Sequence, residues 1–541
     1  MPAIITDQFR ILNAETFAQS FTGIGTTTNY YYTFLGHPNP TNVSIGDYGD
    51  TDWGTTNGTP APRDSFKEEN LYHDSMLFLK RVTATDVRRV VRRYNWELGI
   101  TYDMYKNNYD INNKSPQTAA TTLYGSKFFI VNSEFKVYAC LNNGANPEFP
   151  KGQKSLAEPN FVDVTPQAAG TGSDGYLWKY LYTISPSDVV KFATDSYIPL
   201  PEKWGDISTK SIKDAAVDGK LETIVIKRRG TATVDGVDGD ISGIPIIGDG
   251  TGGTATATVT NGVVSEIKLS NTNSSGYTYA HVRFVNGTWG GKKLVVGTLT
   301  DEPQFEVIIP PKGGHGADIY RELGAFRVMV YSKFDNNIND KTDYIVGNDF
   351  SRVGIVKDPT DLSGTSILNK RTATSLGALK LKVPASSSTQ LSNVVYKTNT
   401  KITQYNSSDS SLGIGTAIGY VASWDSTTGV LRYYQPVGFS TFSVYGYELK
   451  NFVGVQTNTP ITGATHIVPG QSVDNLVVDS GFNGESVSVG QRDVALGQNF
   501  TNGVSDPEIK KYSGEIIYID NRAPITRTAS QKEEVKIVIE F

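Results

Sequence analysis

The sequence predicts a mainly β protein with a few short helices, of the all-β or α+β class. Glycine accounts for 53 of 541 residues, against a usual share of about 7%. Charged residues make up 19%, against a usual share of about 25%. A chain rich in Gly, Ser, Thr and Asn, with 29 tyrosines, favours short strands and turns over long helices. Its 38% of apolar residues suffice for a buried core.

The first 215 residues are predicted to contain two helices. The first covers residues 14–21. The second covers residues 86–96, with Thr85 as its N-cap, because four side chains follow a helical spacing. Those side chains are Val87, Val90, Val91 and Tyr94. The other predicted elements of this part are strands at 127–131, 135–141 and 176–184, a turn at 132–133 and a Pro/Gly-rich loop at 147–175.

A small antiparallel β module is predicted over residues 216–310. Thr and Ala alternate along residues 254–260, which is the period of a half-buried strand. Asn261 and Gly262 follow, the strongest short-range hairpin signal, and an apolar segment returns over residues 263–267.

A second β module is predicted over residues 346–510, with its clearest hairpin formed by residues 417–423 and 430–434. The closing element has a strand at 516–519, a turn at Pro524 and an alternating strand up to Phe541. That last strand must pair with another, most simply in the N-terminal part. We therefore predict a discontinuous β-sandwich-like host domain that carries two inserted modules. Its predicted segments are 1–215, 311–345 and 511–541.

Charge and cysteine content exclude several classes of protein. Fifty basic and fifty-five acidic residues give a net charge of −5, which disfavours a general binder of nucleic-acid phosphates. Cys140 is the one cysteine, so an internal disulfide framework is excluded, and no Cys/His cluster has zinc spacing. Asp7 and Arg10 interrupt what would be the apolar part of a secretory leader. We expect a soluble protein that matures in a reducing compartment.

Residues 248–253 fit the G-x-G-x-x-G pattern of dinucleotide-binding loops. Such a loop needs a helix after it, because amides at the helix N-terminus hold the pyrophosphate. An alternating Thr/Ala segment follows instead and predicts a strand. We interpret the glycines as a turn between strands and expect no cofactor.

Four residues partly match a calcium-binding loop: Asp238, Asp240, Ser242 and Asp249. Gly243 lies at the position where such a loop turns sharply. The flanks are predicted strands, and the last ligand is Asp rather than the usual bidentate Glu. A solvated acidic turn is therefore favoured, and a bound calcium ion is the weaker alternative.

One stretch concentrates basic residues, namely Lys80, Arg81, Arg88, Arg89, Arg92 and Arg93. The favoured interpretation is the solvated face of an amphipathic helix. The functional alternative is a patch that binds an acidic protein partner, since the net charge is negative and no RNA- or DNA-reading motif accompanies it.

The sequence offers no catalytic constellation. It has neither a G-x-S-x-G elbow nor an H-E-x-x-H helix. His73, beside Asp74, is expected to be exposed, His315 to lie in a glycine-rich turn, and Cys140 to be a buried thiol. Paired carboxylates for glycoside cleavage stay open, because spacing in sequence does not give distance in space. We expect no enzymatic activity.

The closing element, Ser-Gly-Glu-Ile-Ile-Tyr-Ile-Asp-Asn-Arg-Ala-Pro-Ile at residues 513–525, is the longest of several segments that resemble one family in the same order. Its members are the baseplate wedge subunits, the gene-eight products, of T-even-type contractile-tailed bacteriophages. A weaker match lies at residues 326–327. The residues that carry the resemblance are Phe9, Arg10, Gly36, Arg92, Arg93, Trp96, Asp174, Gly175, Tyr176, Trp178, Gly514, Glu515, Tyr518, Asn521, Arg522 and Pro524.

This resemblance covers residues 1–215, 311–340 and 511–541, roughly half of the chain. It implies a non-enzymatic virion protein of the tail baseplate, assembled in the host cytoplasm. It also implies a homodimer within each wedge that contacts other wedge proteins, the products of genes six, seven and ten, with no nucleic acid and no membrane insertion. Tyrosine-rich surfaces would suit such contacts. The two β modules have no counterpart in the shorter family members.

Two other functions remain open. The inserted modules could bind cell-surface glycan, with Tyr433, Tyr434, Trp289 and Trp424 as stacking platforms, although filling of the module cores is the favoured role of these rings. The third and weakest alternative is a polysaccharide-degrading enzyme.

Overall fold

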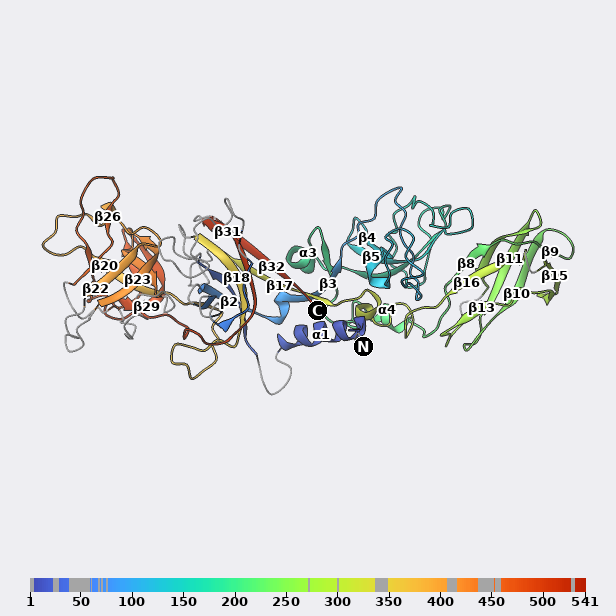
Figure 1. Cartoon of the computed structure of the whole chain (residues 1–541), viewed down its shortest axis with the longest axis horizontal. Coiled ribbons are helices and arrows are strands. Elements are labelled where there is room, and N and C mark those ends of the chain that lie inside the picture. Colours follow the sequence, from blue (N-terminus) through green and yellow to red (C-terminus); the bar gives the residue numbers. More distant parts are fainter. Residues whose placement is uncertain are drawn as a thin grey trace. The chain divides into compact units, whose positions relative to one another are not determined.

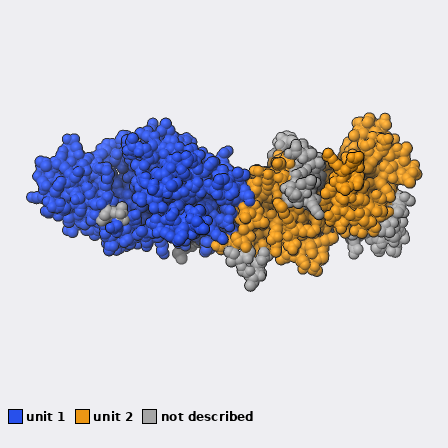
Figure 2. Space-filling model, turned by 180° about the vertical axis from the view of Figure 1, so that it is seen from behind, with its two compact units in different colours: residues 1–18, 88–329, 537–541 blue, residues 19–87, 330–536 orange. Residues whose placement is uncertain are grey.

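The computed structural model confirms a mainly β protein with a few short helices (Figure 1). It forms two compact units (Figure 2). Unit 1 comprises residues 1–18, 88–329 and 537–541, and unit 2 comprises residues 19–87 and 330–536. The structure describes residues 4–22, 29–37, 59, 61–66, 69, 72–73, 76–270, 273–298, 301–335, 349–405, 416–435, 452, 459–526 and 531–541.

A three-stranded antiparallel sheet lies at the centre of unit 1, with the strand order β4-β5-β6. Its strands are β4 (Phe129–Val131), β5 (Lys136–Asn143) and β6 (Tyr176–Thr183). Consecutive residues of β5 are buried, Tyr138 at 0% and Cys140 at 0% exposure among them, so both faces of the sheet are covered. All three strands and the turn after β4 confirm the prediction.

A second sheet of four strands has the order β32-β17-β3-β7. The strands are β3 (Val87–Arg92), β7 (Tyr197–Pro199), β17 (Arg327–Phe334) and β32 (Glu533–Glu540). The C-terminal strand is thus paired, as its alternation predicts. Its neighbour is β17 rather than a strand from the first 215 residues.

The predicted helix at 86–96 is wrong. Residues 84–86 form a single 3-10 turn, and β3 begins at Val87. Asp86, not the expected cap Thr85, accepts hydrogen bonds from the backbone N–H of Thr83 at 3.1 Å and from its hydroxyl at 2.6 Å. Val87, Val90 and Val91 are all buried, as predicted, but in a strand. Closely spaced valines fit both periods, and β-branched side chains pack better on a sheet.

The helices are short. Helix α1 (Asp7–Ser20) confirms the first predicted helix but begins at Asp7 rather than at residue 14. The other helices whose bounds are described are α3 (Pro186–Phe192), α4 (Lys210–Asp214) and α5 (Ile319–Glu322), with 3-10 turns η2 (Ala84–Asp86), η3 (Leu123–Gly125) and η4 (Leu391–Asn393). Within the described residues, none of the helices has the length and apolar character needed to span a bilayer.

The first β module has its own core and belongs to unit 1. Asn261 and Gly262 both have positive φ, at 53° and 71°, and form the predicted hairpin between β11 and β12. The module's strands are β8 (Thr223–Arg228), β9 (Ala232–Val234), β10 (Gly239–Gly248), β11 (Thr254–Thr260), β12 (Val263–Leu269), β13 (Ala280–Val282), β14 (Gly287–Trp289), β15 (Lys292–Val296) and β16 (Gln304–Ile308).

The paired strands β8 and β16 connect this module to the rest of unit 1. Val225 and Ile308 pack in the same core as the β4-β5-β6 sheet. Ile224, Ile226 and Val307 pack in the core of the module. Because the two faces of one ribbon belong to two cores, the module is joined by packing and not by a bare linker.

Unit 2 contains a five-stranded sheet of order β19-β2-β1-β18-β31. Residues 346–374 were predicted to open the second module, but β18 and β19 belong to this sheet. Pro524 lies within β31 and not in the predicted turn. The β18–β31 register shifts between Phe350 and Arg352, and Pro524 falls in that irregularity, where a missing N–H is tolerated. The strands are β1 (Tyr31–Gly36), β2 (Met76–Val82), β18 (Asp349–Lys357), β19 (Thr372–Thr374) and β31 (Glu515–Thr526).

Most of the remaining strands of unit 2 pack on a separate apolar core, while β28 and β29 contribute to a smaller one. The largest sheet has the order β22-β23-β24-β20-β27-β25, with β30 also paired to β20. The predicted hairpin at 417–434 is confirmed as β23 and β24. The strands are β20 (Gly377–Lys382), β21 (Val394–Val395), β22 (Lys401–Tyr405), β23 (Thr416–Asp425), β24 (Val430–Tyr434), β25 (Pro460–Ile461), β26 (Thr465–His466), β27 (Leu476–Val478), β28 (Gly484–Val489), β29 (Arg492–Phe500) and β30 (Val504–Ser505).

Candidate functional sites

Three distant segments of the resemblance meet at the C-terminus within unit 1. Arg10 of α1 donates to Glu540 at 2.7 Å and to the backbone oxygen of Phe541, and its guanidinium lies 3.8 Å from the ring centroid of Phe326. Arg327 donates to the other carboxylate oxygen of Glu540 at 2.7 Å. The ring of Phe541 packs 5.4 Å from that of Phe17. We call these residues the terminal cluster.

Electrostatics favour an ionised Glu540 in the terminal cluster. Burial raises the pKa of Glu540, but the hydrogen bonds and charges of Arg327 and Arg10 outweigh it and hold the pKa below its ordinary value. Phe9 is the neighbouring signature residue on α1, and it is 52% exposed. It therefore does not take part in the cluster.

The second group of signature residues fixes the loop that precedes β6. Asp174 is buried, and its carboxylate accepts the backbone N–H of Leu156 at 2.8 Å and of Tyr176 at 3.1 Å. Gly175 has φ 73°, and a Cβ there would lie 2.9 Å from Cα of Gly144. Tyr176 stacks on Trp178 at 5.1 Å between ring centroids. These roles are structural.

Two of the signature residues at 92–96 also have structural roles within unit 1. Arg93 donates to Asn95 at 2.7 Å and to the backbone oxygen of Thr194 at 3.1 Å. Trp96 donates its indole N–H to Ser155 at 3.0 Å. Arg92 is exposed.

Many tyrosine hydroxyls fasten loops to the sheets. Each of the following donates to a backbone carbonyl: Tyr102 to Asn95, Tyr138 to Phe161, Tyr176 to Gln153, Tyr182 to Pro199 and Tyr320 to Pro201 in unit 1, and Tyr32 to Leu368 and Tyr396 to Ile461 in unit 2. Burial raises the pKa of Tyr102 to about 12, so its phenol stays protonated. These tyrosines are buried or half-buried and serve the internal packing of each unit.

The signature residues of unit 2 lie along β1 and β31. Arg352 is fully buried, donates to Asn521 at 3.4 Å and lies 5.4 Å from the ring of Tyr72. Tyr518 pairs with Ile355, and Gly36 with Arg352. Gly514 has φ 83°, and a Cβ there would meet the backbone oxygen of Lys357 at 2.7 Å. Ion pairs join Glu515 to Lys357 at 3.2 Å and Arg522 to Asp520 at 2.6 Å.

Most residues of the basic stretch have partners, and all but Arg93, which follows β3, lie on strands rather than on a helix face. Arg88 forms ion pairs with Asp188 at 3.1 Å and Glu202 at 3.0 Å, and Arg89 lies over the ring of Tyr320. In unit 2, Lys80 donates to the backbone oxygen of Lys333, and Arg81 donates to that of Asn369 at 3.1 Å. These partners leave little of the stretch for an acidic protein.

The calcium candidate is wrong in geometry. Asp238 accepts the backbone N–H groups of Asn261 and Gly262 at 2.6 and 2.9 Å, and Asp240 accepts from the Thr258 hydroxyl at 2.7 Å. Ser242 and Gly243 lie within β10, and Asp249 follows its end, where it binds Thr278. Eight residues of β10 lie between Asp240 and Asp249, which an extended strand keeps roughly 30 Å apart, so they cannot share an ion. The glycines at 248–253 are followed by β11, a strand, as predicted.

His73 is buried, against expectation, and His37 and His315 are buried as well. In unit 1, His315 Nδ1 lies 2.7 Å from Glu322 Oε1, and the other oxygen of Glu322 accepts the N–H of Gly316 at 2.7 Å. In unit 2, burial lowers the pKa of His73 to about 4; its neighbour Asp74 lies outside the described residues. Cys140 is a buried core thiol, as predicted, and burial raises its pKa. No sequence pattern indicates the His315–Glu322 pair.

The rings proposed as glycan platforms are mostly packed inside. Tyr433 and Tyr434 are each 5% exposed. Trp424 donates its N–H to the backbone oxygen of Val394 at 2.8 Å, and Trp289 packs against the core of the first module. The favoured core-filling interpretation therefore agrees with the structure.

Ion pairs also fix the first module within unit 1. Glu306 of β16 binds Lys106 at 2.6 Å and Lys227 at 2.9 Å. Burial raises the pKa of Glu306, but hydrogen bonds and charge from the two lysines outweigh it and lower the pKa to about 2. Arg229 binds both oxygens of Glu148, at 2.8 and 2.7 Å.

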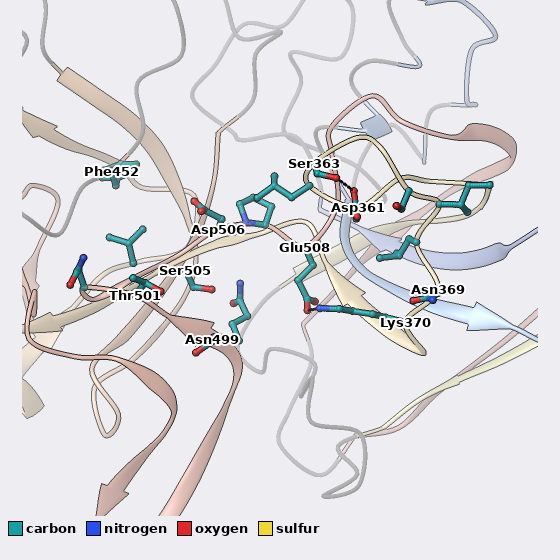
Figure 3. Close-up of a pocket in the computed structure, with 18 residues that line it drawn as sticks. Asp361, Ser363, Asn369, Lys370, Phe452, Asn499, Thr501, Ser505, Asp506 and Glu508 are labelled. Carbon is teal, nitrogen blue, oxygen red and sulfur yellow. Dashed lines mark hydrogen bonds and ion pairs between the residues drawn. The ribbon is translucent and has the colours of Figure 1, made fainter.

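A polar groove of about 920 Å³ lies within unit 2 (Figure 3). The loop at 361–370 forms one wall, and the end of β29 with residues 501–508 forms the other. Lys370 and Glu508 form an ion pair across 2.7 Å. Sequence reasoning missed this groove, because its two walls are more than a hundred residues apart and neither carries a known motif.

Neither a scan against protein-family models nor a search of curated proteins finds a match to this chain.

Proposed function

We propose that this chain is a structural subunit of a contractile phage tail baseplate, a homodimeric wedge subunit that links neighbouring wedge proteins. The terminal cluster is the observation that supports this best. Residues of the resemblance from the first ten positions, from Phe326 and Arg327, and from the C-terminus contact one another around Arg10 and Glu540. Residues that contact one another restrict which side chains can replace them. Such a restriction on distant segments fits a resemblance that recurs in the same order along the chain.

The way in which the loops are held supports a mechanical role. Tyrosine hydroxyls bind the carbonyls of loops, and buried Asp174 fixes a backbone turn. Buried Arg352 binds Asn521 on the neighbouring strand, and ion pairs hold the first module. Units built in this way keep their shape when their contacts change. A baseplate subunit must do this, because its interfaces repack while its fold persists. The chain acts by shape and adhesion, in the virion tail, without catalysis or cofactor.

The experiment is the solution mass of the purified full-length chain, followed by mixing with the other wedge proteins. We expect a dimer and a complex with at least one of the products of genes six, seven and ten. A chain that stays monomeric at high concentration and joins none of these proteins would contradict the proposal. An obligate interface of this kind buries about 2,000–5,000 Å².

A further inference from the structure

The groove in unit 2 is lined by polar side chains that have unused hydrogen-bonding capacity. Within the described part of the chain, the side chains of Asn369, Asn499, Thr501 and Asn502 have no hydrogen-bond partner, and neither has the hydroxyl of Ser505. Figure 3 shows Asn499, Thr501 and Ser505 on one side of the groove and Asn369 on the other. Amides and hydroxyls supply both donors and acceptors without charge.

Two of the lining residues are buried, and one of them, Gln498, carries a buried oxygen without a hydrogen-bond partner. Ser505 is 4% exposed and Gln498 is 5% exposed. Gln498 donates to the backbone oxygen of Leu376 at 2.9 Å, while its Oε1 has no partner. Buried polar groups are nearly always paired, so the unsatisfied oxygen of Gln498 at this groove points to an unseen polar partner.

The charges in the groove exclude two classes of ligand. The groove is lined by three carboxylates and one lysine, namely Asp361, Asp506, Glu508 and Lys370. Because Lys370 is already paired with Glu508, a phosphate or another anion would be repelled. Asp361 is occupied by the Ser363 hydroxyl at 2.5 Å. Among the described residues, no three acidic, histidine or cysteine side chains are placed to hold a metal ion.

The groove also has an apolar surface. Leu362 and Ile367 are 47% and 45% exposed, and Pro507 lies in the opposite wall. The volume lies within the range of about 300–1,000 Å³ that is usual for ligand sites. A pyranose ring offers hydroxyls at its edge and C–H groups on its faces, and so matches amides and hydroxyls beside exposed aliphatic side chains.

We propose that this groove binds an uncharged glycan, with Asn499, Ser505 and Gln498 as hydrogen-bonding residues and Ile367 and Leu362 as the apolar contact. The site lies at different residues from the tyrosine and tryptophan platforms, which are packed in cores. It goes beyond the structural role and does not depend on it. A baseplate subunit could use it to hold the tail against a cell surface.

The test is binding of the labelled full-length chain to an array of neutral and sialylated oligosaccharides, followed by titration of the best neutral oligosaccharide in solution. Asn499→Ala and Ser505→Ala each remove groups that have no partner within the described chain, so thermal unfolding should not change. We expect each to weaken neutral-glycan binding about fivefold to tenfold. Asn112→Ala is the matched control, because Asn112 is an exposed asparagine of unit 1 and leaves the groove intact.

Asn499→Trp tests the location independently by filling the groove, and we expect it to abolish binding. The proposal is overturned if no neutral oligosaccharide binds, if only sialylated ones bind, or if the Trp variant binds as the original chain does. Because the readout is ligand binding and not solution mass, failure here leaves the wedge-subunit proposal to its own test.

Discussion

Single glycines show how closely the backbone of unit 1 is packed. Gly175 and Gly99 both have positive φ, at 73° and 79°. They differ in surroundings: a Cβ at position 175 would lie 2.9 Å from Cα of Gly144, whereas nothing lies within 4 Å of one at position 99. Both belong to segments that carry the resemblance, but only at Gly175 does a neighbouring backbone atom exclude a side chain.

We predict that Gly175→Ala is more destabilising than Gly99→Ala. Both substitutions cost the strain of a left-handed alanine, about 1–2 kcal/mol. The Cβ contact with Gly144 adds about 1–3 kcal/mol, because a backbone atom must move. Urea or thermal unfolding of the two variants measures the difference. Equal unfolding midpoints would show that the loop before β6 adapts and is not held as the structure indicates.

Secondary-structure elements were predictable where the signal is local. The hairpin at Asn261 and Gly262 needs only positive φ at two adjacent residues, and the sequence carries it. The segment at 87–92 was misjudged, because Val87, Val90 and Val91 satisfy a helical spacing, while the sheet partners that decide the outcome lie at residues 197–199 and 327–334. Proline is typical of turns, so Pro524 was predicted to lie in one, but a register shift between β18 and β31 accommodates it within a strand.

The candidate sites depended on contacts that no local pattern contains. Arg10 and Glu540 are separated by almost the whole chain. The calcium-like spacing failed because an extended strand carries Asp240 and Asp249 apart. His315 lies in a glycine-rich turn, as expected, yet Glu322 from the following helix reaches it. Residue type and spacing along the sequence therefore predicted many of the strands. The contacts between side chains that are distant in sequence became visible only in the structure.

At the element scale, the ribbon of β8 and β16 should show acid sensitivity. Glu306 has a pKa lowered to about 2 in the folded chain, against an ordinary value of 4.5. A depressed carboxyl pKa stabilises the fold above the ordinary value, and that contribution is lost as the pH falls from about 4.5 to 2. Glu306→Gln should remove this part of the pH dependence.

At neutral pH we expect Glu306→Gln to destabilise unit 1 by about 1–3 kcal/mol, since it leaves the largely buried amine of Lys106 without its counter-charge. Glu266→Gln is the control, because Glu266 and its partner Lys268 are more than half exposed and such pairs contribute about 0–1 kcal/mol. Urea unfolding at pH 7 and pH 3 measures both variants. If Glu306→Gln and Glu266→Gln behave alike, the ion pairs do not hold the module.

At the scale of the whole molecule, the proposed subunit needs a surface for association. Helix α1 turns Ile11 and Ala14 inward, and both are buried. Phe9 and Leu12 are 52% and 56% exposed, and Ile5, which precedes the helix, is 71% exposed. The spacing i, i+3 places Phe9 and Leu12 on one face of the helix. An apolar stripe on one helix can pair with its own copy across a two-fold axis.

We predict that the double substitution Phe9→Ser and Leu12→Ser converts the proposed dimer to a monomer. Both side chains are exposed, so the free energy of unfolding should stay within about 0.5 kcal/mol of that of the original chain. Val190→Ser is the matched control, because Val190 is a 68% exposed apolar residue of α3. Light scattering across a concentration series gives the mass of each variant. A double variant that remains dimeric would exclude this helix face as the contact between copies, because two serines remove the apolar area that such a contact would bury.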